Sequence, residues 1–185
     1  SREDLALAEK IIQTKLRHFF LNKGITLIDP ESNYFSYDTI IKKDVTIFPN
    51  VFIGEGVKID SGSSILSFCH LENCYIKKNV SIGPFARIRG NTVLNENNKI
   101  DHLSYIGDTS IGKSSNIGAG SITCNYDGHK KNKTFIGSNA FVGSNSTMVA
   151  PLKIGNNSTI GAGSVITQDV NNGDLAIGRE RQVNK

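Results

Sequence analysis

One histidine of this chain stands among side chains that could take part in proton transfer. His102 follows Asp101 directly, and Tyr105 lies three residues further on. A histidine accepts a proton near neutral pH, because the pKa of an unperturbed imidazole is about 6.5. His102 is therefore a candidate general base. The alternative is an exposed histidine without a catalytic role.

A second group of polar residues falls in the segment 122–136. Asn125 and Tyr126 offer an amide and a phenol for hydrogen bonds, and Lys130 and Lys131 supply positive charge. Lysines beside a pocket suit a phosphate, because an ammonium group makes charge-assisted hydrogen bonds with phosphate oxygens. We interpret the segment as a candidate binding loop. The alternative is a solvated insertion without a function.

Two arginines flank an aliphatic residue that we expect to point inward. Arg87 and Arg89 lie on either side of Ile88. Successive side chains of an extended strand point to opposite faces, so both arginines are expected on the outer surface. This spacing predicts two positively charged side chains at one edge of the fold.

A series of small residues, ending in a cation, suits an extended ligand. Ser144 and Ala162 are followed by Arg179 near the end of the chain. Such a strip would let a pantetheine arm lie along the surface with its phosphate end at the arginine. Small residues are also common at the turns of this chain, so a structural explanation stays open.

All these residues sit on a repeat of six, which predicts the fold. An aliphatic residue returns at about every sixth position from Ile41 to Ile166, usually with a small or β-branched residue four positions later and often with Gly directly after it. No α-helix has this period, and a flat sheet would alternate by two. The pattern predicts an all-β solenoid, a left-handed parallel β-helix of hexapeptide repeats. Three hexads close a triangular coil, and about seven coils stack about 4.8 Å apart.

The sequence also shows where the six-residue period is interrupted. A step of five residues leads from Ile117 to Ile122, so Ile122 is expected to point inward. The next inward residue is Ile136, which leaves an excursion of about eight residues around Asn125. Loops that leave a rigid repeat commonly carry function.

The chain divides into three segments: a linker helix and lead-in over 1–40, the β-helix over 41–170 and an irregular tail over 171–185. A helix is expected over 2–22, ending near Gly24, where it would cap the open end of the column. The chain opens inside this helix without a Met, which favours a fragment of a longer protein. The apolar positions at helical spacing are Leu5, Ala8, Ile12, Leu16 and Phe19, and the apolar face is broadened by Leu7, Ile11, Phe20 and Leu21.

Composition argues against several other classes of function. The net charge is only +4, with acids and bases intermixed, so neither a nucleic acid nor a membrane is expected as a partner. No signal peptide or bilayer-spanning apolar run is present, and we expect a cytoplasmic protein. Cys69, Cys74 and Cys124 lack CxxC spacing and are interpreted as structural thiols. A β-helix metalloenzyme of the γ-type carbonic anhydrase class needs closely spaced histidines, so no metal site is expected from four scattered ones.

Four stretches together resemble one family of hexapeptide proteins. The chain is similar, over nearly its whole length, to the C-terminal acetyltransferase domain of the bacterial bifunctional N-acetylglucosamine-1-phosphate uridyltransferase / glucosamine-1-phosphate N-acetyltransferase. Nothing here resembles the family's upstream uridyltransferase domain, so magnesium-dependent nucleotidyl transfer is not expected of this chain. The stretches are SIGPFARIR (81–89), HLSYIGD (102–108), NIGAGSITCNYDG (116–128) and FVGS (141–144).

The resemblance implies an activity. His102 would take a proton from the amine of glucosamine 1-phosphate as that nitrogen attacks the thioester of acetyl-CoA. The product, N-acetylglucosamine 1-phosphate, feeds UDP-N-acetylglucosamine synthesis for peptidoglycan and lipopolysaccharide. A backbone N–H near Ala119 is a candidate donor to the tetrahedral oxyanion, an effect worth about 3 kcal/mol.

The resemblance also implies ligands and partners. A homotrimer with its sites between subunits is implied, and an upstream uridyltransferase domain is implied for the full protein. The residues that match sugar-phosphate ligands are Arg89, Tyr105, Asn116 and Lys131. The residues that match acetyl-CoA contacts are Ala119, Asn125, Tyr126, Ser144, Ala162 and Arg179.

Two other functions stay open at this stage. One is another hexapeptide acyltransferase that acts on a different amino sugar or on a nucleotide sugar, against which the loop from Asn125 to Gly128 argues. The other is a catalytically silent trimeric scaffold. It is kept because the chain is about one coil shorter than the family pattern between Arg89 and His102, where the family carries an acidic residue and a substrate-binding lysine.

The short region generates a first prediction. Loss of one layer moves Arg89 by about 4.8 Å along the column relative to His102. We therefore expect weak binding of glucosamine 1-phosphate and largely unimpaired binding of acetyl-CoA. Calorimetric titration of each ligand separately measures this difference, and equally tight binding of both would contradict it.

Overall fold

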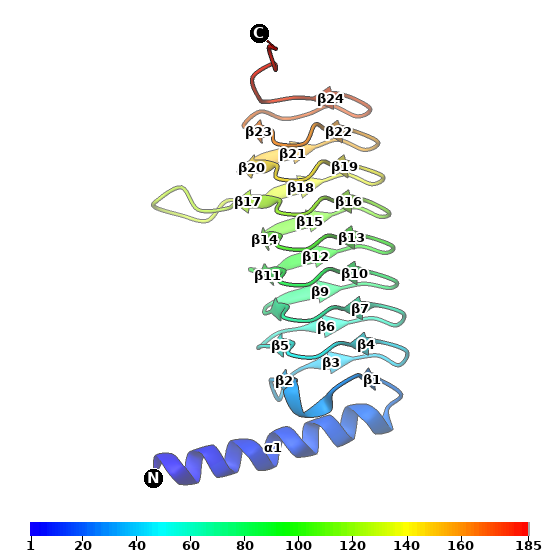
Figure 1. Ribbon diagram of the computed structural model, residues 1–185, viewed down its shortest axis with the longest axis vertical. Helices are drawn as coiled ribbons and strands as arrows, with labels where there is room; N and C mark the ends of the chain where they lie inside the picture. Colours follow the sequence, from blue (N-terminus) through cyan, green and yellow to red (C-terminus); the bar gives the residue numbers. More distant parts are fainter. Residues whose placement is uncertain (185) are drawn as a thin grey trace.

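The chain winds into a triangular column that stands on one helix. The computed structural model describes residues 1–184, and in it a left-handed parallel β-helix rises from α1 (Arg2–Asn22) (Figure 1). All strand pairs are parallel, and each strand pairs with strands of the coils above and below. Ser64 pairs with Ser81 and Arg87 with Tyr105, so one regular coil takes 17 or 18 residues.

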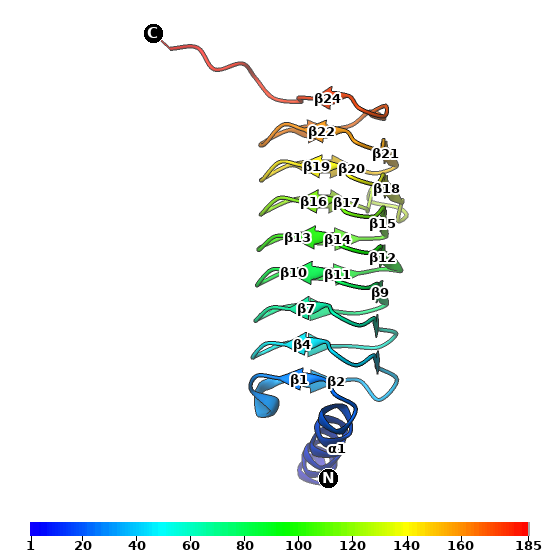
Figure 2. The ribbon, with the colours of Figure 1, turned by 90° about the vertical axis from the view of Figure 1, so that its right-hand side faces the viewer.

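Three sheets form the three faces of the column, as the view turned by 90° makes plain (Figure 2). Sheet 1 contains β1 (Thr26–Leu27), β4 (Thr46–Ile47), β7 (Ser64–Ile65), β10 (Ser81–Ile82), β13 (Lys99–Ile100), β16 (Asn116–Ile117), β19 (Phe141–Val142), β22 (Thr159–Ile160) and β24 (Leu175–Ala176). Sheet 2 contains β2 (Tyr34–Phe35), β5 (Phe52–Ile53), β8 (His70–Leu71), β11 (Arg87–Arg89), β14 (Tyr105–Gly107), β17 (Ile122–Cys124), β20 (Thr147–Val149) and β23 (Val165–Ile166). Sheet 3 contains β3 (Ile40–Ile41), β6 (Lys58–Ile59), β9 (Cys74–Ile76), β12 (Thr92–Leu94), β15 (Thr109–Ile111), β18 (Thr134–Ile136) and β21 (Leu152–Ile154).

The core is a stack of inward side chains, nearly all of them aliphatic, contributed by the successive strands. Their burial removes apolar surface from water in every coil, and this is the main stabilising contribution to the fold. The predicted hexapeptide β-helix is therefore confirmed. In sheet 1 the inward column runs through Leu27, Ile47, Ile65, Ile82, Ile100, Ile117, Val142 and Ile160.

The prediction for Ile122 is wrong. Ile122 points outward and is 42% exposed, while Thr123 is fully buried and stands above Ile106 in the stack. The step from Ile117 is thus six residues, and a threonine occupies the inward position. Its hydroxyl makes this possible, because it accepts a hydrogen bond from the backbone N–H of Gly107 at 2.8 Å.

The column contains more coils than the six-residue period of aliphatic residues predicts. The three sheets hold nine, eight and seven strands, which makes about eight coils where about seven were expected. Paired strands extend beyond 41–170 at both ends, since β1 and β2 lie in the lead-in and β24 lies in the tail. The step from Leu27 to Phe35 is eight residues and includes a 3₁₀ turn at Pro30–Ser32, so the period of six does not reveal this coil. Lys185, the last residue of the predicted tail, lies outside the described residues.

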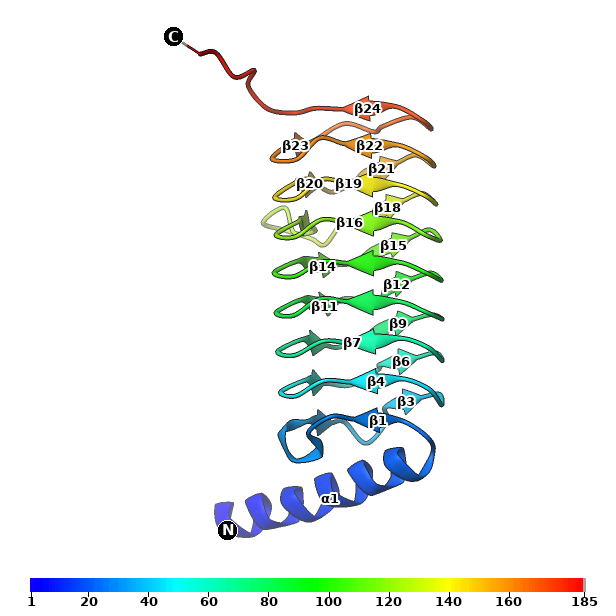
Figure 3. The ribbon, with the colours of Figure 1, turned by 45° about the vertical axis from the view of Figure 1, so that its right-hand side comes forward.

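Helix α1 lies across the base of the column (Figure 3), and its buried face agrees only in part with the prediction, since Phe20 is buried and Leu16 packs on the core but most of the other apolar positions are exposed. Leu5 is 70% exposed and Ile12 47%, while Gln13 and Phe20 are buried. Phe20 packs on Phe35 with ring centroids 4.8 Å apart. The Gln13 amide both donates to the backbone oxygen of Phe35, at 2.7 Å, and accepts from its N–H, at 3.0 Å. The helix thus covers the lowest strands through one amide and one aromatic side chain.

The corners require left-handed backbone, which short polar residues and Gly mostly supply. Three bulky residues depart from this rule at the corner between sheets 1 and 2. Phe68, Phe85 and Leu103 have φ of 63°, 60° and 59° in consecutive coils. For such side chains this conformation costs about 1–2 kcal/mol each. The Phe68 and Phe85 rings stack in parallel, 4.8 Å apart, directly below the coil of His102.

No helix of residues 1–184 is both long and apolar enough to cross a membrane.

The inward stack generates a prediction on stability. Ile88 is fully buried in the middle of the column, so Ile88→Ala is expected to reduce the free energy of unfolding by about 3 kcal/mol. Ile40→Ala is the matched control, because Ile40 is 53% exposed on the outer face of sheet 3, and its effect should stay below about 1 kcal/mol. Chemical denaturation measures both, and equal effects would contradict this packing.

Candidate functional site

His102 lies at the corner between sheets 1 and 2, in the turn between β13 and β14. Its side chain is exposed, as predicted, and makes no hydrogen bond or ion pair with the residues that the structure describes. The neighbouring Asp101 carboxylate is paired with Lys99 at 3.2 Å. The imidazole is therefore free to meet a ligand on the outside of the column.

The same corner brings four predicted residues into line with His102. Strand register places Ala119, Ser144 and Ala162 above it in successive coils. Backbone hydrogen bonds join these layers: the carbonyls of His102, Ala119 and Ser144 accept from the next coil at 2.9, 2.7 and 2.8 Å. Arg179 completes the line, because its Nε donates to the backbone oxygen of Ala162 at 2.8 Å. We call these five residues the corner ladder.

Small residues allow the coils to approach closely at the corner ladder and leave no large side chain between its two ends. A side chain at Gly118 would bring its Cβ within 2.6 Å of the backbone nitrogen of Ser144, and one at Gly143 within 2.5 Å of that of Ala162. The glycines are thus required by close approach of the coils. The N–H of Ala119 makes no hydrogen bond with any described residue, so it is available as a donor one coil above His102.

A second group of predicted residues gathers on sheet 2. Tyr105 donates from its hydroxyl to Oδ1 of Asn125 at 3.4 Å, and the Asn125 amide hydrogen-bonds to the Asp108 carboxylate. Contact with the Tyr105 hydroxyl, and to a lesser extent with the Glu72 carboxylate, raises the pKa of Arg89 above its ordinary value. Arg89 therefore stays charged next to Tyr105 and Asn125.

The loop after β17 is held together by one carboxylate. Oδ1 of Asp127 accepts from the backbone N–H groups of His129 and Lys130 at 2.9 and 2.8 Å, and Oδ2 accepts from the Asn132 amide at 2.8 Å. These bonds lower the pKa of Asp127 to about 2, with the Lys130 N–H contributing most. The sequence analysis missed Asp127, although an Asp followed by Gly in a loop is a common turn signal.

The loop is an insertion that makes its coil longer than the regular ones. Asn116 pairs with Phe141, 25 residues further on, which is 7 or 8 more than the 17 or 18 of a regular coil. Tyr126 and Lys131 form an isolated antiparallel bridge in this excursion and are exposed. Figure 1 shows the loop projecting sideways from β17.

The remaining predicted residues are not all brought together within one chain. Asn116 is half-buried on the outer face of sheet 1, beside Lys99 and Phe141. His102 precedes β14 and Asn125 follows β17, so they lie at opposite ends of the strands of sheet 2. The corner ladder, the group on sheet 2 and the loop are three separate features of a single column.

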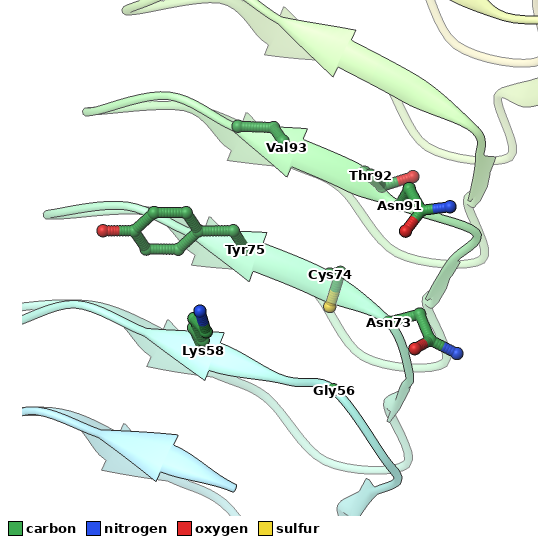
Figure 4. Close-up of a pocket in the computed structure, with 8 residues that line it drawn as sticks. All are labelled: Gly56, Lys58, Asn73, Cys74, Tyr75, Asn91, Thr92 and Val93. Carbon is green, nitrogen blue, oxygen red and sulfur yellow. The ribbon is translucent and has the colours of Figure 1, made fainter.

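A hollow on sheet 3 has no part in this arrangement. Lys58, Cys74 and Tyr75 are among its lining residues, and it lies on the face opposite the corner of His102 (Figure 4). Burial raises the pKa of Cys74 to about 12 and that of Cys69 to about 11, so neither thiol is a nucleophile at neutral pH. Within residues 1–184, no group of three or more His, Cys, Asp or Glu side chains is placed to hold a metal ion.

The fold and the repeat define a hexapeptide β-helix protein. Residues 133–168 match the family described as bacterial transferase hexapeptide (six repeats). Two solved structures show the same fold: a UDP-N-acetylglucosamine O-acyltransferase from Moraxella catarrhalis (TM-score 0.72, 16% identity, 80% of this chain and 63% of that one) and LpxA from Acinetobacter baumannii (TM-score 0.56, 21% identity, 80% and 70%).

Among curated proteins, the chain is similar over its whole length to the bifunctional protein GlmU. The identity is 51% to that of Wolbachia pipientis wMel and 46% to that of Anaplasma marginale (strain Florida). Each alignment includes the whole of this chain and 47% of the relative, so the chain spans about half the length of the curated relatives that it matches. The resemblance to the acetyltransferase part of the bifunctional family is thereby confirmed.

These alignments also bear on the length of the column. Each runs over 202 positions against the 185 residues of this chain, which leaves 17 positions of the relative without a counterpart. Since one coil takes 17 or 18 residues, the chain lacks, within the aligned stretch, a number of positions equal to one coil.

The Asp127 turn generates a prediction on the loop. Asp127→Ala removes three hydrogen-bond acceptor contacts, so trypsin should cleave after Lys130 and Lys131 at least about fivefold faster than in the parent. Asp127→Asn keeps one acceptor oxygen, so its cleavage rate should lie between those of the parent and Asp127→Ala. Equal cleavage of all three proteins would contradict this role of the carboxylate.

The same turn has a defined dependence on pH. The folded-state pKa of Asp127, about 2, lies below the ordinary value of 3.8. The stabilisation is therefore complete above about pH 4 and is lost as the pH falls towards 2. Loop protection measured by hydrogen exchange should be constant in the parent from neutral pH down to about pH 4 and should fall below it, whereas Asp127→Ala should show no such fall.

Proposed function

We propose that this chain transfers an acetyl group from acetyl-CoA to the amine of glucosamine 1-phosphate, giving N-acetylglucosamine 1-phosphate. The observation that carries the proposal is the corner ladder. It places a free imidazole at one end and a guanidinium at the other, with only small residues between them. The similarity to about half of each GlmU supports the same assignment.

The donor would lie along the corner ladder. Four intervals separate His102 from Arg179, which amounts to about 19 Å at the spacing of parallel strands. An extended pantetheine arm fits such a strip, because no side chain rises from Ala119 or Ala162 to obstruct it. The Arg179 guanidinium would then meet the phosphates of coenzyme A, with its terminal nitrogens as donors. Ser144 would contact the arm between the two ends.

The chemistry is a direct transfer. The amine of the sugar is protonated in water and becomes a nucleophile only after it loses a proton, which His102 would accept. The neutral nitrogen attacks the thioester carbon, and the oxygen of the tetrahedral intermediate takes the negative charge. The free N–H of Ala119 would stabilise this oxyanion. Collapse breaks the carbon–sulfur bond and releases coenzyme A, whose thiolate takes up the proton held by His102, while the second proton of the attacking nitrogen is released to water.

The acceptor would bind between the corner and sheet 2. Arg89 and Tyr105 stand on that face, and Tyr105 follows His102 by three residues. A charged guanidinium and a phenol suit a sugar phosphate, because both donate hydrogen bonds to phosphate oxygens. Asn116 lies on the other side of the corner and would contact the sugar ring from sheet 1.

A homotrimer would complete the site. Lys131 and Tyr126 belong to a loop that projects away from its own column (Figure 1). A second copy packed alongside would receive this loop against its corner ladder, so that Lys131 could meet the phosphate and Asn125 and Tyr126 the coenzyme. The full protein would carry a uridyltransferase domain upstream, as the shared half of each relative suggests.

The shorter column favours one alternative. With 17 positions fewer than the aligned stretch of its relatives, the chain would retain the corner ladder but lack one layer of the acceptor site. A trimer that binds coenzyme A without turnover is then the second candidate. Measurable acetylation of glucosamine 1-phosphate by the parent protein would exclude it.

The proposed base generates a direct test. His102→Ala should lower kcat for glucosamine 1-phosphate about 100- to 1000-fold, because the amine would then lose its proton only to water. The KM for acetyl-CoA should change little, since the corner ladder above is intact. His18→Ala, an exposed histidine on α1, is the matched control and should behave like the parent. Activity that survives His102→Ala would remove His102 from the mechanism.

A further inference from the structure

A carboxylate that the proposed site does not use joins two arginines on sheet 2. Oε1 of Glu72 lies 3.0 Å from Nη2 of Arg87 and 2.9 Å from Nε of Arg89. Glu72 directly follows β8, and both arginines stand on β11, one coil above it. One oxygen atom thus makes ion pairs with two guanidinium groups.

This arrangement has a physical cause. Arg87 and Arg89 are two residues apart on one strand and point to the same outer face. Two like charges so placed repel each other, unless an opposite charge lies between them. Only 25% of the Glu72 side chain is exposed, against 32% and 35% for the arginines. The charges are therefore screened less by water than those of a fully exposed pair.

A histidine lies beside the carboxylate on the same coil. His70 lies on the coil of Glu72, and its Nε2 is 3.7 Å from the second oxygen of Glu72. The imidazole packs on the Phe52 ring at 4.5 Å between centroids. Burial, and then the charge of Arg87, lower the pKa of His70, so it does not compete with the arginines as a cation. Asp108, the acidic residue of the coil above, is engaged by Asn125.

The two arginines keep donors free towards the outside. Glu72 contacts Nε of Arg89 and one terminal nitrogen of Arg87. The other terminal nitrogen of Arg87 makes no hydrogen bond within the described part of the chain, and the Arg89 guanidinium also contacts the Tyr105 hydroxyl. Because Arg87 pairs in register with Tyr105, these donors lie one coil below the corner of His102. Two guanidinium groups that share one carboxylate oxygen suit the three oxygens of a phosphate monoester.

We propose that Glu72 is a positioning residue and Arg87 a second phosphate ligand: the Glu72 carboxylate holds Arg87 and Arg89 side by side as a clamp for the phosphate of the acceptor. This inference rests on the proposed function, which assigned the phosphate to Arg89 and Tyr105 on sheet 2. The clamp acts on binding of the acceptor and leaves the donor site untouched.

The test compares steady-state kinetics of three variants. Glu72→Gln and Arg87→Met should each raise the KM for glucosamine 1-phosphate about tenfold, while kcat and the KM for acetyl-CoA stay within about twofold of the parent. Glu96→Gln is the matched control, because Glu96 is 28% exposed and pairs with Lys113 on another part of the surface. It should leave all constants unchanged.

A double-mutant cycle separates positioning from a general loss of structure. If Glu72 acts through the arginines, Glu72→Gln should add less than about twofold to the KM of an Arg89→Met protein. Full additivity, or an equal rise in the KM for acetyl-CoA, would overturn the inference. The thermal midpoint of Glu72→Gln should match that of Glu96→Gln, because half-exposed pairs contribute little to stability.

Binding of inorganic phosphate keeps this test independent of the proposed reaction. Phosphorus NMR titration should show phosphate binding to the parent that is about tenfold weaker in Glu72→Gln and in Arg87→Met. If the parent does not acetylate glucosamine 1-phosphate, the proposed function fails, but this loss of phosphate binding would still support the clamp. Equal phosphate binding by parent and variants would overturn the clamp even in an active enzyme.

Discussion

Hydrogen bonding between parallel strands of successive coils is the interaction on which the rest of the structure depends. It fixes the rise from one coil to the next at the spacing of a sheet, and the inward aliphatic stack prevents a slip of register, because a shift by one residue would turn that stack outwards. Side chains at equivalent corners therefore stand in a straight line. The corner ladder is a direct product of this constraint. Residues from 102 to 179 become neighbours along one edge without any contact between their side chains.

The sequence predicted most of this, because the fold is built from a local period. One inward aliphatic residue per hexad is enough to assign strands, corners and outward positions, so the surface positions of His102, Arg87 and Arg89 followed directly. The period gave a wrong prediction where a side chain that hydrogen-bonds to the backbone takes the inward position of an aliphatic one. Thr123 takes an inward position because its hydroxyl finds backbone partners, and an aliphatic Ile122 beside it hides the substitution. The coil from Leu27 to Ile41 was missed because its first step is irregular.

The candidate site was harder to predict, since periodicity orders residues along a corner but does not show which corners cooperate. Alignment of Ala119, Ser144 and Ala162 with His102 follows from counting hexads. The separation of Asn125 from His102 by the whole width of sheet 2 does not, and neither does the role of Asp127 in the loop. Glu72 had no signal in the sequence, because its partners lie 15 and 17 residues further on and meet it only through the coil register.

A stack of coils has two open ends, and each end strand presents unpaired backbone groups that another column could extend. At the base, the Gln13 amide donates to and accepts from the backbone of Phe35 in the manner of a neighbouring strand. One side chain thereby imitates a peptide group and occupies the edge. The helix that supplies it cannot itself be extended by a further coil. End-to-end joining of columns through the edge of β2 is thereby opposed by a single glutamine and the helix that carries it.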